Sequence, residues 1–333
     1  MFVVGSYQLA VIFCVITMIA WGSWTNAQKL TAKSWRYEFF YWDYMLGILF
    51  FSLFVGLTLG SHGETGRPFL ADLRQLSLTS VFSIFLGGCI GNAGNILVCA
   101  AISLAGMALA CPVAVGTAAV LGVILNYCVN PVGNVFLLCV GVILLVAALV
   151  FNGISYARVK KGARSGRLGI FLALVSGILM GASSPFVARA MELESFTTPE
   201  VGKALPYSAF FIFACGLFFS NFLWGTIMMK KPVQGEIANY RDYFRGTFSN
   251  HIVGFFCGCF WSVGSLCNYL AFQKAGVPIA YALGQTSPLI AALWGVFVWK
   301  EFKGADKKTY VFLALMFFLF LAGLSLIILA GKN

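Results

Sequence analysis

Residues 134–174 read NVFLLCVGVILLVAALVFNGISYARVKKGARSGRLGIFLAL, which is an apolar run, a basic cluster and a second apolar run. The first run is close to the roughly 20 residues with which a helix spans the hydrocarbon core of a bilayer. The cluster falls near the midpoint of the chain and consists of Arg158, Lys160, Lys161, Arg164 and Arg167. The stretch therefore predicts two membrane-spanning helices joined by a basic loop.

The same pattern recurs along the whole chain of 333 residues. Hydrophobic residues make up 60% and charged residues only 10%, whereas a soluble protein needs roughly 25% charged residues. Apolar runs long enough to span a bilayer begin near Tyr7, Phe39, Leu78, Met107, Asn134, Leu168, Pro206, His251, Val277 and Tyr310. The sequence predicts an all-α membrane protein with ten transmembrane helices.

The 22 Lys and Arg residues predict the orientation. Sixteen of them lie in four loops: the midpoint cluster and the residues Lys29, Lys33, Arg36, Lys230, Lys231, Arg241, Arg245, Lys300, Lys303, Lys307 and Lys308. Because basic loops stay in the cytoplasm, we expect a multi-pass protein of the plasma or inner membrane with both termini outside. The net charge of +11 is thus explained by topology, and no nucleic-acid partner is expected.

Weak internal similarity indicates a duplication around the basic midpoint. Trp21 to Thr25 corresponds to Met180 to Ser184, and Ala105-Gly106 corresponds to Ala275-Gly276. We predict a first repeat over residues 1–157, a basic cytoplasmic linker over 158–167 and a second repeat over 168–333. Five spans in each half make the second repeat inverted, as in alternating-access transporters, so one chain contains both halves and a monomer suffices.

Polar side chains inside apolar spans are candidates for a binding site, because each costs free energy in lipid unless it meets a partner or water. We predict a substrate site formed by residues at helical spacing in several spans, namely Trp24, Asn26, Asn92, Asn95, Trp261, Ser265, Asn268, Tyr281 and Gln285. Amides, hydroxyls and aromatic rings without charge suit a neutral solute such as a sugar, nucleobase or ureide. Hydrogen bonding between helices is the alternative role of each residue.

Asp43 is the one carboxylate clearly inside an apolar run, about one turn into the second predicted helix. Protonation linked to ligand occupancy would make it the coupling residue of a proton symporter. The alternative is an interfacial side chain that pairs with Lys29 or Arg36. His251, at the start of the eighth span, is expected to be an interface residue.

Pro185 and Pro288 follow hydroxyl residues inside two spans, where each removes a backbone donor. They are predicted hinges, with a static kink as the alternative. The ten cysteines all fall in apolar runs and are expected to pack as small residues, so no metal and no cofactor is predicted.

Several short motifs resemble the drug/metabolite transporter superfamily: Ala20 to Trp24, the Gly-Asn pairs of residues 91–95, and Gly295 to Glu301. Within it the chain is most similar to the cluster of glucose/ribose-type sugar porters and plant ureide permeases, in Trp42-Asp43-Tyr44, Leu86 to Gly88, Gly181 to Pro185 and Gln285 to Leu289. The resemblance spans essentially the whole chain and implies proton-coupled uptake of a small neutral polar solute.

These observations predict a secondary active transporter that imports a small neutral polar solute, with a monosaccharide favoured. Uptake of a ureide, nucleobase or nucleoside is an alternative that the residue types do not separate from it. A multidrug exporter is a second alternative, although a deep glutamate that would hold a cation is absent. No span carries paired aspartates, HExxH, GxSxG or another catalytic constellation, so an enzyme is not expected.

Overall fold

The computed structural model describes residues 1–27, 30, 35–63, 65–159, 167–232 and 236–332. Most of the predicted linker 158–167 lies outside the described residues. So do five of the predicted loop residues, Lys29, Lys33, Lys160, Lys161 and Arg164.

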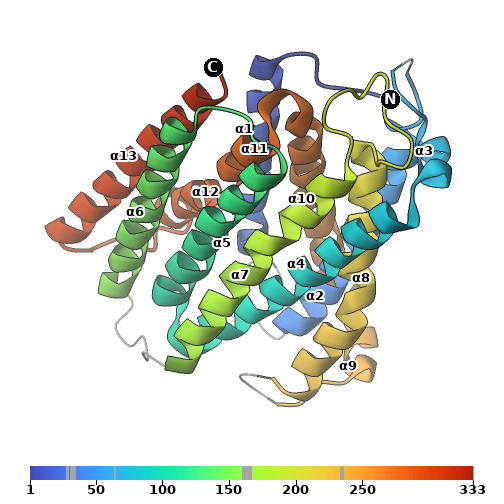
Figure 1. Ribbon diagram of the computed structural model, residues 1–333. Helices are drawn as coiled ribbons and strands as arrows, with labels where there is room; N and C mark the ends of the chain where they lie inside the picture. Colours follow the sequence, from blue (N-terminus) through green and yellow to red (C-terminus); the bar gives the residue numbers. More distant parts are fainter. Residues whose placement is uncertain (28–29, 31–34, 64, 160–166, 233–235, 333) are drawn as a thin grey trace.

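Within the described ranges, ten spans are long and apolar enough to cross a membrane (Figure 1). They are α1 (Tyr7–Ala27), α2 (Tyr37–Leu57), α4 (Leu78–Ala105), α5 (Met107–Val129), α6 (Val135–Val159), α7 (Arg167–Ala190), α8 (Pro206–Lys230), α10 (Phe248–Ala275), the interrupted span α11–α12–η2, and α13 (Lys307–Ala330). Each begins within three residues of its predicted start. The predicted all-α fold with ten spans is therefore confirmed. Spanning segments are helical because backbone in lipid must satisfy its own hydrogen bonds.

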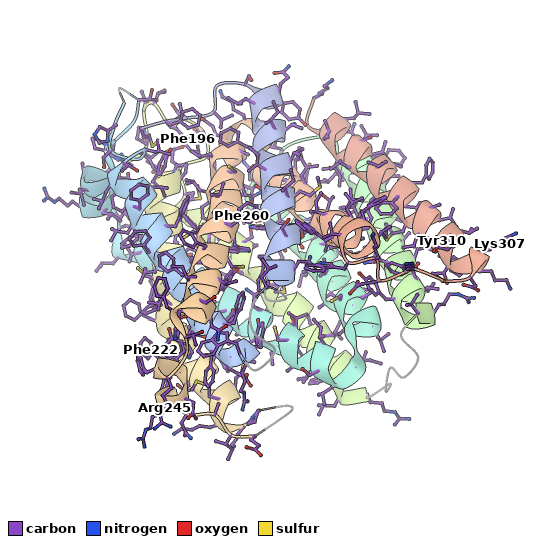
Figure 2. All side chains as sticks on the ribbon, turned by 180° about the vertical axis from the view of Figure 1, so that it is seen from behind. Phe196, Phe222, Arg245, Phe260, Lys307 and Tyr310 are labelled. Carbon is purple, nitrogen blue, oxygen red and sulfur yellow. The ribbon has the colours of Figure 1, made fainter. Side chains whose placement is uncertain are left out.

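Two short helices were not predicted. Helix α3 (Phe69–Gln75) precedes α4, and α9 (Tyr240–Phe244) precedes α10. Figure 1 places α3 at the end of the bundle that carries both chain termini and α9 at the opposite end. Figure 2 shows Phe196 near the first end and Arg245 at the second, with Phe222 and Phe260 on the outer surface between them. These two phenylalanines are 54% and 45% exposed, as expected of a surface that contacts lipid.

The two matched glycines, Gly106 and Gly276, form turns of nearly the same backbone conformation. Gly106 joins α4 to α5 with φ 78° and ψ 155°, and Gly276 joins α10 to α11 with φ 80° and ψ 147°. Both positive φ values lie in a region that disfavours residues with a Cβ. Each turn follows a helix of 28 residues, and the two turns lie at opposite ends of the bundle (Figure 1).

Helix pairs from the two halves pack in a matching pattern. Helix α4 packs on α7 and α8, α10 packs on α1 and α2, and α6 packs on α13. Glycines allow these close approaches. A Cβ at Gly88 of α4 would lie 2.3 Å from the Phe213 carbonyl oxygen of α8, and one at Gly258 of α10 would lie 2.1 Å from the Tyr44 carbonyl oxygen of α2.

The ninth span is not the continuous helix that its apolar run predicts. It consists of α11 (Val277–Gly284), α12 (Ser287–Leu293) and the π-helical turn η2 (Trp294–Val298), with Gln285 and Thr286 between the first two. Pro288 has no N–H to donate to the Gly284 carbonyl, and its ring would clash with that carbonyl in an unbroken helix. The Thr286 hydroxyl donates to the Leu283 carbonyl at 2.5 Å and replaces part of the lost bonding.

Candidate functional site

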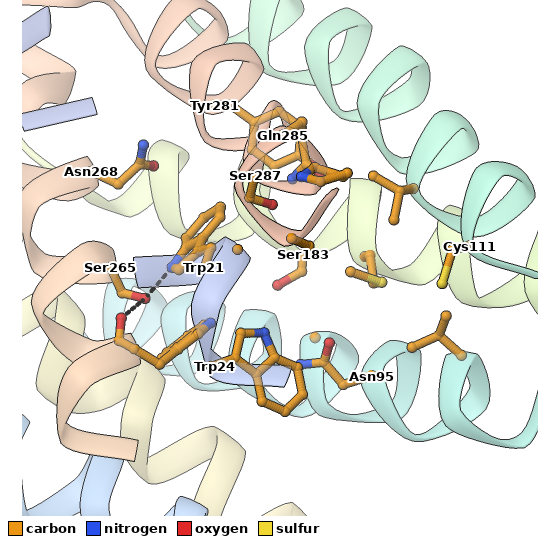
Figure 3. A pocket seen from close by; sticks show the side chains of 18 of the residues that line it. Trp21, Trp24, Asn95, Cys111, Ser183, Ser265, Asn268, Tyr281, Gln285 and Ser287 are labelled. Carbon is orange, nitrogen blue, oxygen red and sulfur yellow. Dashed lines mark hydrogen bonds between the residues drawn. The ribbon is translucent and has the colours of Figure 1, made fainter. Parts of the chain in front are cut away.

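A cavity of about 300 Å³ lies inside the bundle, lined by residues of α1, α4, α5, α6, α7, α8, α10, α11 and α12 (Figure 3). Its lining reaches Ile102 in the last turn of α4, Pro112 in the second turn of α5 and Tyr156 in the last turn of α6. All three turns lie at the α9 end of the bundle (Figure 1). The cavity therefore extends from mid-bundle towards the end that carries α9.

Most of the predicted substrate-site residues meet at this cavity. Seven of the nine line it: Trp24, Asn95, Trp261, Ser265, Asn268, Tyr281 and Gln285. They come from α1, α4, α10 and the interrupted span, which helical spacing alone could not bring together. None of the residues that line the cavity is charged.

The structure places the other two predicted residues elsewhere. Asn92 is fully buried, accepts a hydrogen bond from the Tyr41 hydroxyl at 2.8 Å, and donates to Ser220 and the Leu217 carbonyl. Asn26 accepts a hydrogen bond from the Trp299 indole at 2.8 Å. Both side chains join helices, which was the alternative role for every residue of the set.

Amide side chains on one wall are open to a ligand. The Gln285 amide makes no hydrogen bond among the described residues and projects from the break in the ninth span, as Figure 3 shows. Asn268 donates from Nδ2 to the Ala280 carbonyl at 2.9 Å, which leaves its Oδ1 without a donor in the described part of the chain. This wall therefore offers both donors and acceptors.

Tryptophan side chains form the rest of this polar wall. The Trp21 indole stacks on Trp261 with ring centroids 5.9 Å apart and donates to the Ser265 hydroxyl at 3.0 Å (Figure 3). Trp24 stacks on Tyr44 at 4.9 Å. Flat aromatic faces beside open amides suit a planar or ring-shaped solute.

The opposite wall is mainly apolar. It is formed by Val98 and Ile102 of α4 and by Cys111, Pro112 and Val115 of α5. Asn95 of α4 and Asn152 of α6 are polar residues beside this wall. The Oδ1 of Asn152 is buried and has no hydrogen-bond partner among the described residues. The cavity thus has one polar and one apolar side.

Tyr281 has a structural contact in addition to its place on the wall. Its hydroxyl donates to the Ala118 carbonyl of α5 at 3.2 Å. The ring lies against Gly122, where a Cβ would come within 2.3 Å of Cε1. Helix α11 therefore packs directly on α5 through this residue.

Asp43 lies outside the cavity and is 3% exposed. Its Oδ1 accepts a hydrogen bond from the Tyr243 hydroxyl of α9 at 2.6 Å and lies 2.8 Å from His251 Nδ1 of α10. The predicted alternative partner Arg36 instead pairs with Glu38 at 2.8 Å, so that part of the prediction is wrong. Lys29, the other predicted partner, lies outside the described residues.

The second carboxylate oxygen of Asp43 is buried without a hydrogen-bond partner in the described part of the chain. Burial together with the bond to Asp43 raises the pKa of the Tyr243 phenol well above its usual range. The phenol therefore stays protonated and acts as the donor. His251, expected at the interface, belongs to this buried cluster.

The two predicted hinge prolines differ in their surroundings. Pro288 lies in the first turn of α12, lines the cavity and directly follows the interruption. Pro185 is buried within α7, which remains helical through it. Ser183 and Ser184, just before Pro185, line the cavity and donate to the Gly87 carbonyl and to Asn126.

Sequence reasoning missed several lining residues. Trp21, Asn152, Ser183, Ser184 and Ser287 were not among the predicted site residues. Asn152 had a usable signal, since an amide within an apolar run is costly unless it has a function. The described residues contain no group of three metal-ligating side chains.

Comparisons with known proteins agree with a transporter. The family model described as "Ureide permease" matches residues 155–330. Ureide permease 1 of Arabidopsis thaliana is 22% identical over 100% of both chains, and Ureide permease 2 of the same plant is 21% identical over 100% of both. Transmembrane protein 144 homolog B of Dictyostelium discoideum is 26% identical over 49% of this chain and 41% of its own length.

A solved crystal structure has the same fold. It superposes with a TM-score of 0.64 at 14% identity and covers 95% of this chain and 97% of that chain.

The expected transporter, rather than an enzyme, is confirmed by these relatives. The placement with sugar porters and the preference for a monosaccharide find no support in them. Because the family model matches more than half of the chain, this multi-pass membrane protein belongs to the ureide permease family.

Proposed function

We propose that this protein is a proton-coupled permease that imports a small neutral ureide, or a closely related amide-bearing heterocycle, by alternating access. The observation that carries the proposal is an uncharged cavity whose polar wall offers the open amides of Gln285 and Asn268. An amide can donate to a carbonyl and accept from an N–H, so two amides match the alternating donors and acceptors of a ureide. The names of the relatives support the same substrate class.

The division of the cavity supports a defined orientation of the solute. The polar edge of the ligand faces α10 and the break in the ninth span, and its apolar face contacts α4 and α5. Asn152 lines the second side, but its Oδ1 is buried in the protein and has no hydrogen-bond partner among the described residues. A monosaccharide presents hydroxyls all round and would leave several of them against aliphatic side chains, at a cost in desolvation.

Asp43 is the proposed proton site. Its Oδ1 is held by Tyr243 and His251, while its Oδ2 lacks a donor among the described residues and is free to carry a proton. Burial disfavours the charged form of a carboxylate. Since Asp43 does not line the cavity, protonation has to act on the transport cycle through the helices around it.

The basic loops support an orientation of the protein in the membrane. We propose that the α9 end of the bundle faces the cytoplasm of a plasma or inner membrane and that the termini lie outside. The matching packing of the two halves supports inverted repeats over residues 1–157 and 168–333, so a monomer contains the complete pathway. Pro288 at the interruption is the proposed hinge.

The test is uptake into proteoliposomes with an inward proton gradient, using labelled allantoin, nucleobases, nucleosides and monosaccharides. We expect accumulation of one ureide or related heterocycle by the wild type. Asp43→Asn should retain exchange of that solute but lose accumulation. Glu38→Gln is the matched control, because Glu38 is a paired carboxylate on the same helix.

Two results would overturn parts of the proposal. Accumulation of a monosaccharide alone would show that the amide wall does not select the substrate. Equal accumulation by wild type and Asp43→Asn would remove Asp43 from the coupling mechanism, whatever the solute.

A further inference from the structure

Besides the cavity, the bundle has a cluster of cross-half contacts at each end. We define the outer clasp as α3 with Arg67, bound to the loop 199–205. We define the inner clasp as α9, bound to the start of α2. Each clasp joins a short helix of one half to the amino-terminal part of the equivalent long helix, α8 or α2, in the other half.

Asp72 is the centre of the outer clasp and is fully buried. Its Oδ2 accepts a hydrogen bond from the backbone N–H of Leu205, the residue that caps α8, at 2.9 Å. Its Oδ1 accepts from Arg67 Nε at 2.9 Å and from Gln75 Nε2 at 3.1 Å. The carboxylate thus ties α3 to the start of α8.

Arg67 extends the outer clasp. Its guanidinium also donates to three backbone carbonyls of the other half, those of Pro199, Glu200 and Lys203, at 2.9 to 3.0 Å. All these donors and acceptors are outside the apolar spans, where a separated pair would be hydrated. The closed outer clasp is therefore stabilised by several charge-assisted hydrogen bonds. When it opens, water can bond to the separated groups, so opening costs little free energy of desolvation.

The far side of the loop is fixed independently. Glu192 accepts hydrogen bonds from the backbone N–H groups of Glu194, Ser195 and Glu200 at 2.8 to 3.2 Å. Burial alone would raise the pKa of Glu192, but these donors outweigh it and hold the pKa below its usual value. The loop is thereby a preformed surface on which α3 closes.

Asp43 is the centre of the inner clasp. The acceptor carboxylate lies on the short helix in the outer clasp but on the long helix in the inner clasp. The carboxylate belongs to the long helix α2 and the donor, the Tyr243 hydroxyl, to the short helix α9. Tyr240 of α9 stacks edge-on against Trp42 at 5.7 Å, and Arg36 at the start of α2 donates to the Glu236 carbonyl. Here a single carboxylate, aromatic rings and one arginine–carbonyl hydrogen bond make the contact.

We propose that α3 and α9 are paired gates that close the opposite ends of the transport pathway, with Asp72 locking the outer end and Asp43 the inner end. The inference rests on the proposed alternating access, in which one half rocks against the other. Three sets of hydrogen bonds cross between the halves: Asp72 to Leu205, Arg67 to the loop 199–205, and Tyr243 to Asp43. A rocking motion that opens one end must break the clasp at that end and can leave the other closed.

The test uses the native Cys111, which lines the cavity, as a reporter. In a variant that retains Cys111 as its one cysteine, an impermeant maleimide is added from either side of oriented proteoliposomes. Gln75 also bonds to the loop, donating to the Lys203 carbonyl and accepting from the Gly202 N–H. Arg67→Ala and, separately, Gln75→Ala should raise labelling from the α3 side by roughly tenfold, because the lost bonds to the loop shift the equilibrium towards the outward-open state. Arg74→Ala, an exposed arginine of the same helix, is the matched control and should change nothing.

The inner clasp is tested with a matched pair of tyrosines on α9. Tyr243→Phe removes the bond to Asp43 and should raise labelling from the α9 side. Tyr240→Phe removes a bond to Thr226 of the preceding helix in the same half and should leave labelling unchanged.

The labelling assay requires no substrate. A result that contradicts the gates can therefore be distinguished from one that contradicts the proposed function. Unchanged labelling from the α3 side in both outer variants, with labelling from the α9 side intact as proof of folding, would overturn the outer gate. Tyr243→Phe behaving as Tyr240→Phe would overturn the inner gate. A panel in which no ureide is transported, with the labelling pattern as expected, would leave the gates standing and refute the substrate class.

Discussion

Helix α5 and the span α11–α12–η2 begin alike and end differently. Each follows a 28-residue helix and a glycine turn of nearly the same conformation, and each has a proline in its first two turns. Yet α5 is continuous over 23 residues, whereas the second span is interrupted at Gln285 and Thr286. At the equivalent ninth position of each span, α5 has the apolar Val115 and the interrupted span has Gln285, and both side chains line the cavity.

This difference suggests that the two spans have different roles, one as scaffold and one in recognising the solute. An unbroken helix satisfies its own backbone and presents only side chains, while a broken one leaves polar groups for a ligand. We interpret α5 as the fixed apolar wall and the interrupted span as the element that recognises the solute. Each of the following substitutions makes the two spans more alike or disturbs their contact.

The largest effect is expected for Gln285→Val, which gives the interrupted span the apolar side chain that α5 presents. Loss of two hydrogen-bonding groups should weaken solute binding by roughly 100-fold. The Michaelis constant for uptake and the ligand-induced rise in melting temperature measure it. Gln273→Val is the control, because Gln273 donates to the Glu194 carbonyl outside the cavity and should bind the solute normally.

Pro288→Ala should have the second largest effect. The substitution restores a backbone donor and removes the ring clash, so the ninth span can close into a continuous helix as α5 does. We expect roughly tenfold slower transport with binding largely retained, since a hinge residue governs the conformational step. Pro112→Ala in the continuous α5 is the comparison, and equal losses in both variants would argue against a special role of the interruption.

Gly122→Ala tests the direct contact between the two spans. The new Cβ would lie 2.3 Å from the Tyr281 ring, so the ring or the helix must shift, at a cost of about 1–3 kcal/mol in stability. Thermal unfolding of the purified protein and uptake should both be impaired. Gly116→Ala is the control on the same helix, because the nearest atoms there are 4.0 Å away and alanine favours the helix.

The smallest effect is expected for Tyr281→Phe. It removes only the hydroxyl that donates to the Ala118 carbonyl, a bond worth about 1 kcal/mol. The melting temperature should fall slightly while uptake stays within about twofold, a difference of under ~0.5 kcal/mol. A large loss of uptake would instead assign the hydroxyl to the solute.

The sequence predicted the spans well because lipid forces every spanning segment to be a long apolar helix. It did not predict α3 and α9, which have seven and five residues and carry no apolar period of their own. The interruption at Gln285 was also missed, since Pro288 indicated a hinge or a static kink and not a break in the helix. Whether a proline bends or breaks a helix depends on what the freed groups meet in three dimensions.

The candidate site shows the same division. Asn268 and Gln285 were found because polar residues at helical spacing mark one face. Asn92 shares that pattern but faces Tyr41 of α2, and a single helix does not reveal which neighbour its stripe meets. The partners of Asp43 lie 200 and 208 residues further along the chain, beyond the reach of any local pattern.

The uncharged cavity has an electrical consequence. A neutral solute that enters together with one proton moves one elementary charge inward in each cycle, and the cavity lining holds no charged side chain that would move against it. A membrane potential of about 100 mV then contributes ~2.3 kcal/mol to accumulation, or roughly fiftyfold in concentration ratio. Under the proposed proton symport, transport would therefore be measured directly as a current, and voltage would drive uptake even when both sides of the membrane have the same pH.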